Sequence, residues 1–98
     1  MRIHKFIIAC GDGDITRVST LLPLVDPSDY DNWAIRVASH NGQLDIVRLL
    51  LEDSRVDPSV LQNLAIQLAS ENGHTEVVRL LTEHQFRLDG PEYTRNII

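Results

Sequence analysis

Apolar residues in the middle of this chain recur every three or four positions, the spacing that places them on one face of an α-helix. One stripe consists of Trp33, Ile35, Val37 and Ala38, and a second of Leu44, Val47, Leu50 and Leu51. The segment Ser39-His40-Asn41-Gly42 separates the two stripes, and Gly42 suits a left-handed turn residue. The pattern predicts two short helices joined by a tight turn, and no stretch alternates long enough to predict a β-strand.

The same helix pair recurs along the chain. Subtraction of residue numbers gives a repeat of 31 residues that relates the middle of the chain to its last third. The matching segments are Asp26-Pro27-Ser28 with Asp57-Pro58-Ser59, Ala34-Ile35 with Ala65-Ile66, Asn41-Gly42 with Asn72-Gly73, and Val47-Arg48-Leu49-Leu50 with Val78-Arg79-Leu80-Leu81. The N-terminal stretch matches the middle unit at an offset of 29, through Ala9, Gly13, Val18 and Leu21-Leu22. The sequence predicts a single domain over residues 1–98, with repeats at about 1–28, 29–59 and 60–88 and the stub of a further repeat at 89–98.

The predicted helices need one another, because isolated helices shorter than about 12–15 residues are marginal in water. Small residues recur in the first helix of two repeats, where they allow neighbouring helices to lie close: Ala34, Ala38, Ala65 and Ala69. Asn32 and Asn63 precede these helices and are expected to cap them. The predicted fold is an all-α solenoid in which each repeat packs on its neighbours.

At this level of detail the chain resembles the ankyrin repeat family. The segments Trp33–Leu51 and Leu64–Leu81 carry the family's small-residue pair, its Gly-His or a variant of it, and its ending of Val followed by two leucines. Residues 6–22 match through Ala9-Cys10, Gly13 and Leu21-Leu22. The family's opening Thr-Pro-Leu-His is absent, and the period is 31 rather than about 33. The resemblance covers about residues 3–88 and implies an ankyrin-like helix-turn-helix solenoid of about three repeats with short connectors.

Composition and charge then exclude several classes of function. The 98 residues, 43% of them hydrophobic, suit one ordinary domain. Nine basic against 14 acidic side chains give a net charge of -5, so the chain lacks the positive field that holds nucleic acid or an anionic membrane. No apolar run approaches the roughly 20 residues that span a bilayer, and none suits a signal peptide. We expect an intracellular, cytoplasmic protein that binds neither nucleic acid nor membrane.

The residues that could carry chemistry do not have catalytic or metal-binding spacing. The four histidines lie far apart in the sequence: His4, His40, His74 and His84. The single cysteine, Cys10, takes the small-residue position of Ser39 and is expected to be a packed core thiol. Residues 11–14 lack the strand and lysine of a phosphate-binding loop and indicate a turn. We expect no cofactor, no metal and no enzymatic activity; His74 is expected to make a structural hydrogen bond, as that position does in ankyrin repeats.

One arginine recurs in each repeat, three residues after an acid. The pairs are Asp14 with Arg17, Asp45 with Arg48, and Glu76 with Arg79, and two arginines have a further acid four residues on, Glu52 and Glu83. Such pairs stabilise an exposed helix by about 0.2–0.5 kcal/mol each. The arginines therefore indicate a solvated outer face rather than an anion site.

The resemblance places partner-binding residues on the concave face and at the connector tips. The corresponding positions here are Asp29, Tyr30, Asp31, Arg36, His40, Asn41, Leu61, Gln62, Gln67, Glu71 and Asn72. Tyr30 and Trp33 are the natural anchors, since tyrosine and tryptophan are enriched in binding hot spots. Trp33 also takes the position of Leu64, which favours a place in the core, so both roles stay open for it. Asp26, Asp29 and Asp31 make the second connector acidic, which hints at a basic partner segment.

Two functions remain open at this stage. The first is a non-catalytic protein-protein interaction module that binds a protein or peptide on the concave face and connector tips. The alternative is a structural fragment of a longer ankyrin array with no self-sufficient binding site. Apolar residues near the C-terminal end would then leave it uncapped and open to self-association.

Overall fold

The computed structural model describes residues 1–85, and this part of the chain consists of helices and their connections, without a strand. The elements are α1 (Arg2–Asp12), α2 (Ile15–Leu21), the 3-10 turn η1 (Leu22–Leu24), α3 (Asp29–His40), α4 (Leu44–Leu51), α5 (Val60–Glu71) and a helix at residues 75–85. The predicted all-α class is confirmed. The predicted stub at 89–98 lies outside the described residues.

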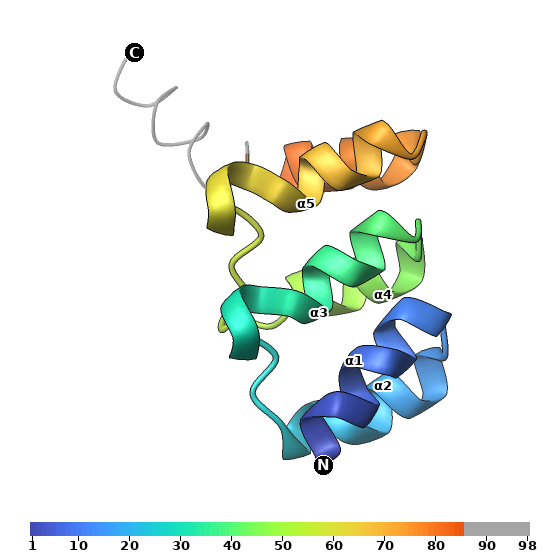
Figure 1. The fold of residues 1–98 in the computed structure, drawn as a ribbon, viewed down its shortest axis with the longest axis vertical. Coiled ribbons are helices and arrows are strands. Elements are labelled where there is room, and N and C mark those ends of the chain that lie inside the picture. Colours follow the sequence, from blue (N-terminus) through green and yellow to red (C-terminus); the bar gives the residue numbers. More distant parts are fainter. Residues whose placement is uncertain (86–98) are drawn as a thin grey trace.

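Three helix pairs are stacked in one direction, as Figure 1 shows. Within a pair the helices are antiparallel neighbours, α1 with α2 and α3 with α4. Between pairs, α3 packs against both α1 and α5, so the first helices of the repeats form one layer. The structure is accordingly elongated, with extents of 49 × 28 × 22 Å. This arrangement confirms the predicted solenoid.

The buried residues hold this layer of first helices to its neighbours. The four small residues singled out from the sequence, Ala34, Ala38, Ala65 and Ala69, are all at most 1% exposed. In α4, Val47 and Leu50 are fully buried as predicted, and Ile46 joins them although it lay outside the predicted stripe. Burial of these side chains removes apolar surface from water, which is the main stabilising contribution to the stack.

The prediction of a core place for Trp33 is wrong. Trp33 is 43% exposed, and Val37, one turn further on, is partly exposed. The buried face of α3 is formed instead by the residues at 34, 35 and 38. Because positions 33 and 37 lie together on another face of the helix, the first apolar stripe of the sequence divides between core and surface.

The first turn of α3 and of α5 is left-handed. Residues 30–32 have φ angles of 57, 54 and 58°, and residues 61–63 have φ angles of 55, 59 and 62°. The last N–H of each turn donates to the carbonyl oxygen four residues earlier, as Asn32 does to Ser28 at 2.9 Å. A left-handed helical conformation costs an ordinary residue about 1–2 kcal/mol. Contacts around each turn must therefore hold it in place.

The prediction that Asn32 and Asn63 cap their helices is wrong. Both residues belong to the left-handed turns, and the N-cap positions are Ser28 and Ser59. The side-chain oxygen of Asn32 instead accepts a hydrogen bond from the backbone N–H of Asp57 at 2.8 Å, and Asn32 is only 5% exposed. Asn32 thus links the second connector to the third, and asparagine also tolerates the left-handed conformation better than most residues.

The turns between paired helices end on glycines with positive φ, 71° at Gly42 and 74° at Gly73. The ring of His74 lies directly against Gly42. The predicted hydrogen bond from this ring is wrong, because within residues 1–85 the ring packs without a hydrogen-bond partner. The corresponding residue one repeat earlier, Gln43, does make such a bond, donating to the carbonyl oxygen of Gly11 at 2.9 Å.

Alanine at Gly42 is expected to destabilise the protein more than alanine at Gly73. The backbone conformation costs alanine about 1–2 kcal/mol at either position. A Cβ at Gly42 would also lie 2.5 Å from Nδ1 of His74, whereas a Cβ at Gly73 meets nothing within 4 Å. We expect Gly42→Ala to lose about 1–3 kcal/mol more than Gly73→Ala in urea denaturation. Equal losses would show that the His74 ring does not constrain this turn.

Most predictions for the remaining side chains hold. Cys10 is fully buried, and burial raises the pKa of its thiol to about 12, which makes it an unreactive core residue. The acid-arginine pairs are present with N–O distances of 3.8, 3.3 and 3.7 Å at Arg17, Arg48 and Arg79, all exposed. The further pairing with Glu52 and Glu83 is wrong for this part of the chain, where neither forms an ion pair with its arginine.

Candidate functional site

The left-handed turns place large side chains at the surface of the first-helix layer. Tyr30 and Leu61 occupy the same position in successive turns, and each is 52% exposed. Asp29, Asp31 and Gln62 beside them are exposed as well. The turns therefore form the connector tips that the sequence pointed to, each carrying one large hydrophobic side chain.

Two of the predicted binding residues hold these turns in place. The guanidinium of Arg36 donates to the carbonyl oxygens of Tyr30 and Asp31, at 2.8 and 3.1 Å. Its counterpart in the next repeat, Gln67, donates to the carbonyl oxygen of Gln62 at 2.7 Å. Since left-handed turns need such support, these two side chains already have a structural task within their own repeats.

An aromatic cluster forms around Tyr30. The ring of His4 from α1 stacks on Tyr30 with centroids 5.9 Å apart and an interplanar angle of 27°. On its other side the Tyr30 ring meets Trp33 edge to face, also at 5.9 Å, with an angle of 84°. The hydroxyl of Tyr30 lies 3.4 Å from Nε2 of His4. Such geometry is favourable for aromatic pairs, so the cluster is an ordered surface feature that bridges α1 and α3.

A hollow of about 420 Å³ opens beside this cluster, between α1 and α3. Its lining consists of His4, Ile7, Ile8, Gly11, Asp12, Trp33, Val37 and Asn41. The side chain of Ile8 is 62% exposed, which is unusual for an isoleucine in a packed helix. We refer to this space, with these eight residues, as the α1/α3 hollow.

The repeat relation extends this surface along the layer. At offsets of 29 and 31, His4, Trp33 and Leu64 take one equivalent position. Ile8, Val37 and Leu68 take another, one turn further along their helices. The two sets form the first-helix face, an apolar strip that crosses α1, α3 and α5. This is the surface that the resemblance implies to be concave.

The other end of the first helices is polar. Asn41 donates to the carbonyl oxygen of Gly11 at 3.0 Å, and its side-chain oxygen lies 2.8 Å from Nδ1 of His40. Asn72 donates to the carbonyl oxygen of Leu68 at 2.7 Å. His40, Asn41, Glu71 and Asn72 are all exposed. The predicted binding residues thus lie at both ends of the first-helix face, at the tips and at these turns.

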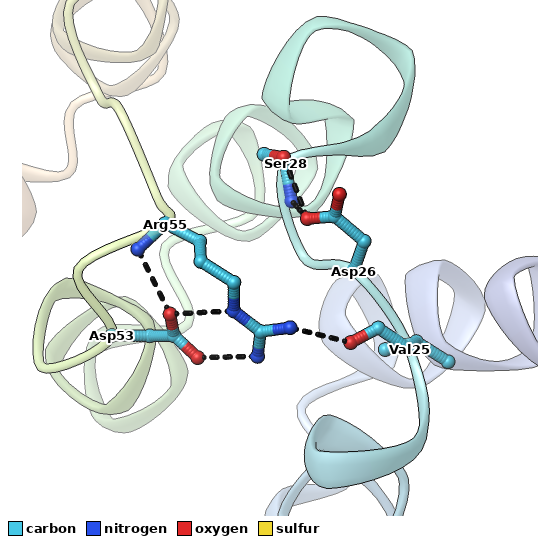
Figure 2. Close-up of polar contacts among 5 residues, drawn as sticks. All are labelled: Val25, Asp26, Ser28, Asp53 and Arg55. Carbon is cyan, nitrogen blue, oxygen red and sulfur yellow. Dashed lines mark hydrogen bonds and ion pairs between the residues drawn. The ribbon is translucent and has the colours of Figure 1, made fainter.

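Figure 2 shows the polar contacts between the connector that precedes α3 and the connector that precedes α5. The guanidinium of Arg55 donates to both carboxylate oxygens of Asp53, at 3.0 and 2.7 Å, and to the carbonyl oxygen of Val25 at 3.1 Å. Asp26 accepts hydrogen bonds from the hydroxyl and the N–H of Ser28, at 2.6 and 2.9 Å. Arg55 therefore ties the connector after α4 to the connector after η1.

Hydrogen bonding lowers the pKa of two carboxyl groups in this network. For Asp26 the main cause is the Ser28 hydroxyl, followed by the Ser28 N–H; for Asp53 it is the Arg55 side chain. Of the acids that make the second connector negative, Asp26 is thus used within the connector itself. Asp29 and Asp31 remain exposed at the tip.

The described residues contain no group of three His, Cys, Asp or Glu side chains that could hold a metal ion. Gly11 and Asp12 end α1, and Gly13 and Asp14 form the turn to α2, in which Asp14 accepts from the Arg17 N–H at 3.1 Å as the N-cap. Over residues 1–85, no helix has the length and apolar character needed to cross a membrane. What this face offers is contact surface with ordered aromatic, apolar and acidic groups.

Of the eight residues that line the hollow, sequence reasoning placed only Asn41 among the binding residues. His4 was considered only as a possible metal ligand or catalytic residue. The offset of 29 residues could have identified two of the lining residues, because it relates His4 to Trp33 and Ile8 to Val37. For Trp33 itself a place in the core was favoured.

The stacked helix pairs and their in-register first-helix face define a helical-repeat solenoid protein. A family model described as "Ankyrin repeats (3 copies)" matches residues 35–97, which is more than half of the chain. The chain belongs to the ankyrin repeat family. Ankyrin repeats are generally protein-protein interaction modules and generally not enzymes. No curated protein and no solved structure matches this chain.

Proposed function

We propose that this protein is a non-catalytic interaction module that binds a protein or peptide on its first-helix face and connector tips. The observation that supports this most directly is the gathering of exposed large hydrophobic residues. Ile8 and Trp33 line the α1/α3 hollow, Tyr30 packs against Trp33 beside it, and Leu61 repeats the position of Tyr30 one unit on. Exposed apolar surface of this kind, bordered by polar residues, is typical of an interaction site.

The polar residues at the edges of this face would give the contact its orientation. Asp29 and Asp31 lie at the tip of the second connector, and His40 and Asn41 at the opposite end of α3. A polar rim around an apolar centre is the usual anatomy of a protein interface. The proposal also places the protein in the cytoplasm, a location that the single buried free cysteine suits.

Alanine at both Tyr30 and His40 is expected to abolish capture of the partner. Both side chains are exposed and neither belongs to the core, so the helical circular dichroism spectrum should not change. Loss of a central tyrosine typically weakens an interface by about 2 kcal/mol or more. The assay is a pull-down from lysate of the source cells with the wild-type and the double-variant protein as bait.

A matched control carries two alanines on exposed second-helix positions, Ser19→Ala with Arg79→Ala. This variant should retain every partner that the wild type captures. Undiminished capture by the Tyr30→Ala, His40→Ala variant, or loss of capture by the control, would contradict the proposed location of the site.

A further inference from the structure

Glycine at position 11 keeps a side chain out of the α1/α3 hollow. A Cβ built on Gly11 would lie 3.2 Å from Cγ2 of Val37 and 3.3 Å from Nδ2 of Asn41, two atoms of the hollow's lining. A side chain at this position would therefore enter the space. The equivalent positions in the next two repeats carry His40 and Glu71. Of the three equivalent positions, only the one in the first repeat lacks a large side chain.

The walls of the hollow are mainly apolar. Ile8 and Val37 line it from α1 and α3, and the ring of Trp33 closes the side nearest the aromatic cluster. A volume of about 420 Å³ holds one large side chain of a partner with room for part of its neighbours. An aromatic face beside aliphatic walls suits a long aliphatic stem, and it also attracts a cation placed over the ring.

Asp12 places a negative charge at one edge of this apolar space. It is the last residue of α1, where the negative end of the helix dipole disfavours a carboxylate. Within residues 1–85 its side chain has neither an ion-pair nor a hydrogen-bond partner. The equivalent residues, Asn41 and Asn72, are neutral. A cation brought to this edge would therefore meet a carboxylate that the equivalent positions of the other repeats lack.

We infer that the α1/α3 hollow takes an arginine or lysine side chain from the bound peptide. The stem lies along Ile8, Val37 and the Trp33 ring, and the cationic end reaches the Asp12 carboxylate. The net charge of -5 and the exposed acids at the connector tip, Asp29 and Asp31, favour the same kind of partner. This inference rests on the proposed function, since it names the partner's chemistry at the same face.

Other occupants fit this hollow less well. A purely apolar side chain would cover Asp12 without pairing it, and desolvation of an unpaired carboxylate is costly. An acidic side chain would meet Asp12, Asp29 and Asp31 as like charges. A basic side chain alone satisfies both the apolar walls and the charge.

The test begins with a library of random 12-residue peptides displayed on phage and selected on the wild-type protein. Selected sequences should share an arginine or lysine flanked by apolar residues. A synthetic peptide of the consensus and its twin with citrulline in place of arginine are then titrated. Trp33 is the only tryptophan of the chain, so its fluorescence reports occupation of the hollow itself. We expect the citrulline peptide to bind about tenfold more weakly, because citrulline keeps the shape but loses the charge.

The other repeats supply the residues for matched variants at positions 11 and 12. Asp12→Asn introduces the residue found at positions 41 and 72, and it should lower affinity for the arginine peptide about tenfold and remove its advantage over citrulline. Gly11→His introduces the residue found at position 40, and it should fill the hollow and weaken both peptides. Asp45→Asn, at an exposed acid of α4, should leave both affinities unchanged.

The outcomes separate this inference from the function on which it rests. Peptides that bind without a shared basic residue, or an arginine advantage that persists in Asp12→Asn, would overturn the inference and leave peptide binding intact. Failure of the folded wild-type protein to select any peptide would contradict the proposed function and the inference together.

Discussion

Replacement of Leu50 by alanine is expected to lower the free energy of unfolding by about 2–5 kcal/mol. The side chain is fully buried in α4 and belongs to the continuous core that joins the stacked helices. Truncation leaves a cavity that the surrounding helices fill only in part. Because small domains are stable by only about 5–15 kcal/mol, a loss of this size removes a large share of the total. Urea denaturation followed by circular dichroism measures it.

The matched control is Leu24→Ala in η1, where the same change is made to a side chain that is 54% exposed. We expect this variant to lose less than about 0.5 kcal/mol. A loss at Leu50 no greater than the loss at Leu24 would contradict the packing of α4 described above.

Asn32→Ala is expected to cost about 2–4 kcal/mol, the second largest effect. The substitution leaves the N–H of Asp57 without the oxygen that it contacts at 2.8 Å, and an unsatisfied donor in such a partly buried place costs about 1–3 kcal/mol. It also places alanine in a left-handed conformation, with φ at 58°, which costs alanine about 1–2 kcal/mol and asparagine less. Thermal and urea denaturation of the purified variant measure the loss.

Asn32→Asp tests whether the loss comes from the hydrogen bond between residue 32 and the N–H of Asp57, which joins the two connectors. Aspartate keeps an acceptor oxygen at the same position and also tolerates the left-handed conformation. This variant should retain most of the stability lost in Asn32→Ala. If both substitutions cost the same, the bond to Asp57 would not be what holds the connectors together.

The class of fold was predictable from the sequence because repetition multiplies a weak signal. A single apolar stripe does not distinguish a surface helix from a buried one, but the same stripe at an interval of 31 residues implies units that pack on one another. The alanines at 34, 38, 65 and 69 recur for the same reason, and the structure buries all four. Because the same helix contacts recur in each repeat, the same residue types recur at the equivalent positions of the sequence.

The left-handed turns were not predicted. Asp31, Asn32 and Asn63 belong to the residue types that adopt this conformation, but Tyr30 and Leu61 do not. Side chains outside the turns make the difference, since the bonds to the turn carbonyls come from Arg36 and Gln67, further along the same helices. The spacing of apolar residues contains no information about the sign of φ, so asparagine was read as a helix cap.

The candidate site was predictable in part for a similar reason. The tips and the exposed ends of the first helices follow from the positions of the turns, which the repeat fixes. The α1/α3 hollow depends instead on what differs between repeats, with glycine at 11, aspartate at 12 and tryptophan at 33. A comparison that looks for identity passes over such differences, and the shorter first repeat obscured which residues correspond.

Site-specific photo-crosslinking tests most directly whether the first-helix face binds a protein. The photoreactive amino acid p-benzoylphenylalanine replaces Tyr30 in one protein and Ser19, exposed on α2, in another, and each is irradiated in lysate of the source cells. The account predicts a discrete crosslinked species from position 30 that excess wild-type protein suppresses and the Tyr30→Ala, His40→Ala variant does not. Suppressible crosslinks from position 19, with none from position 30, would contradict it.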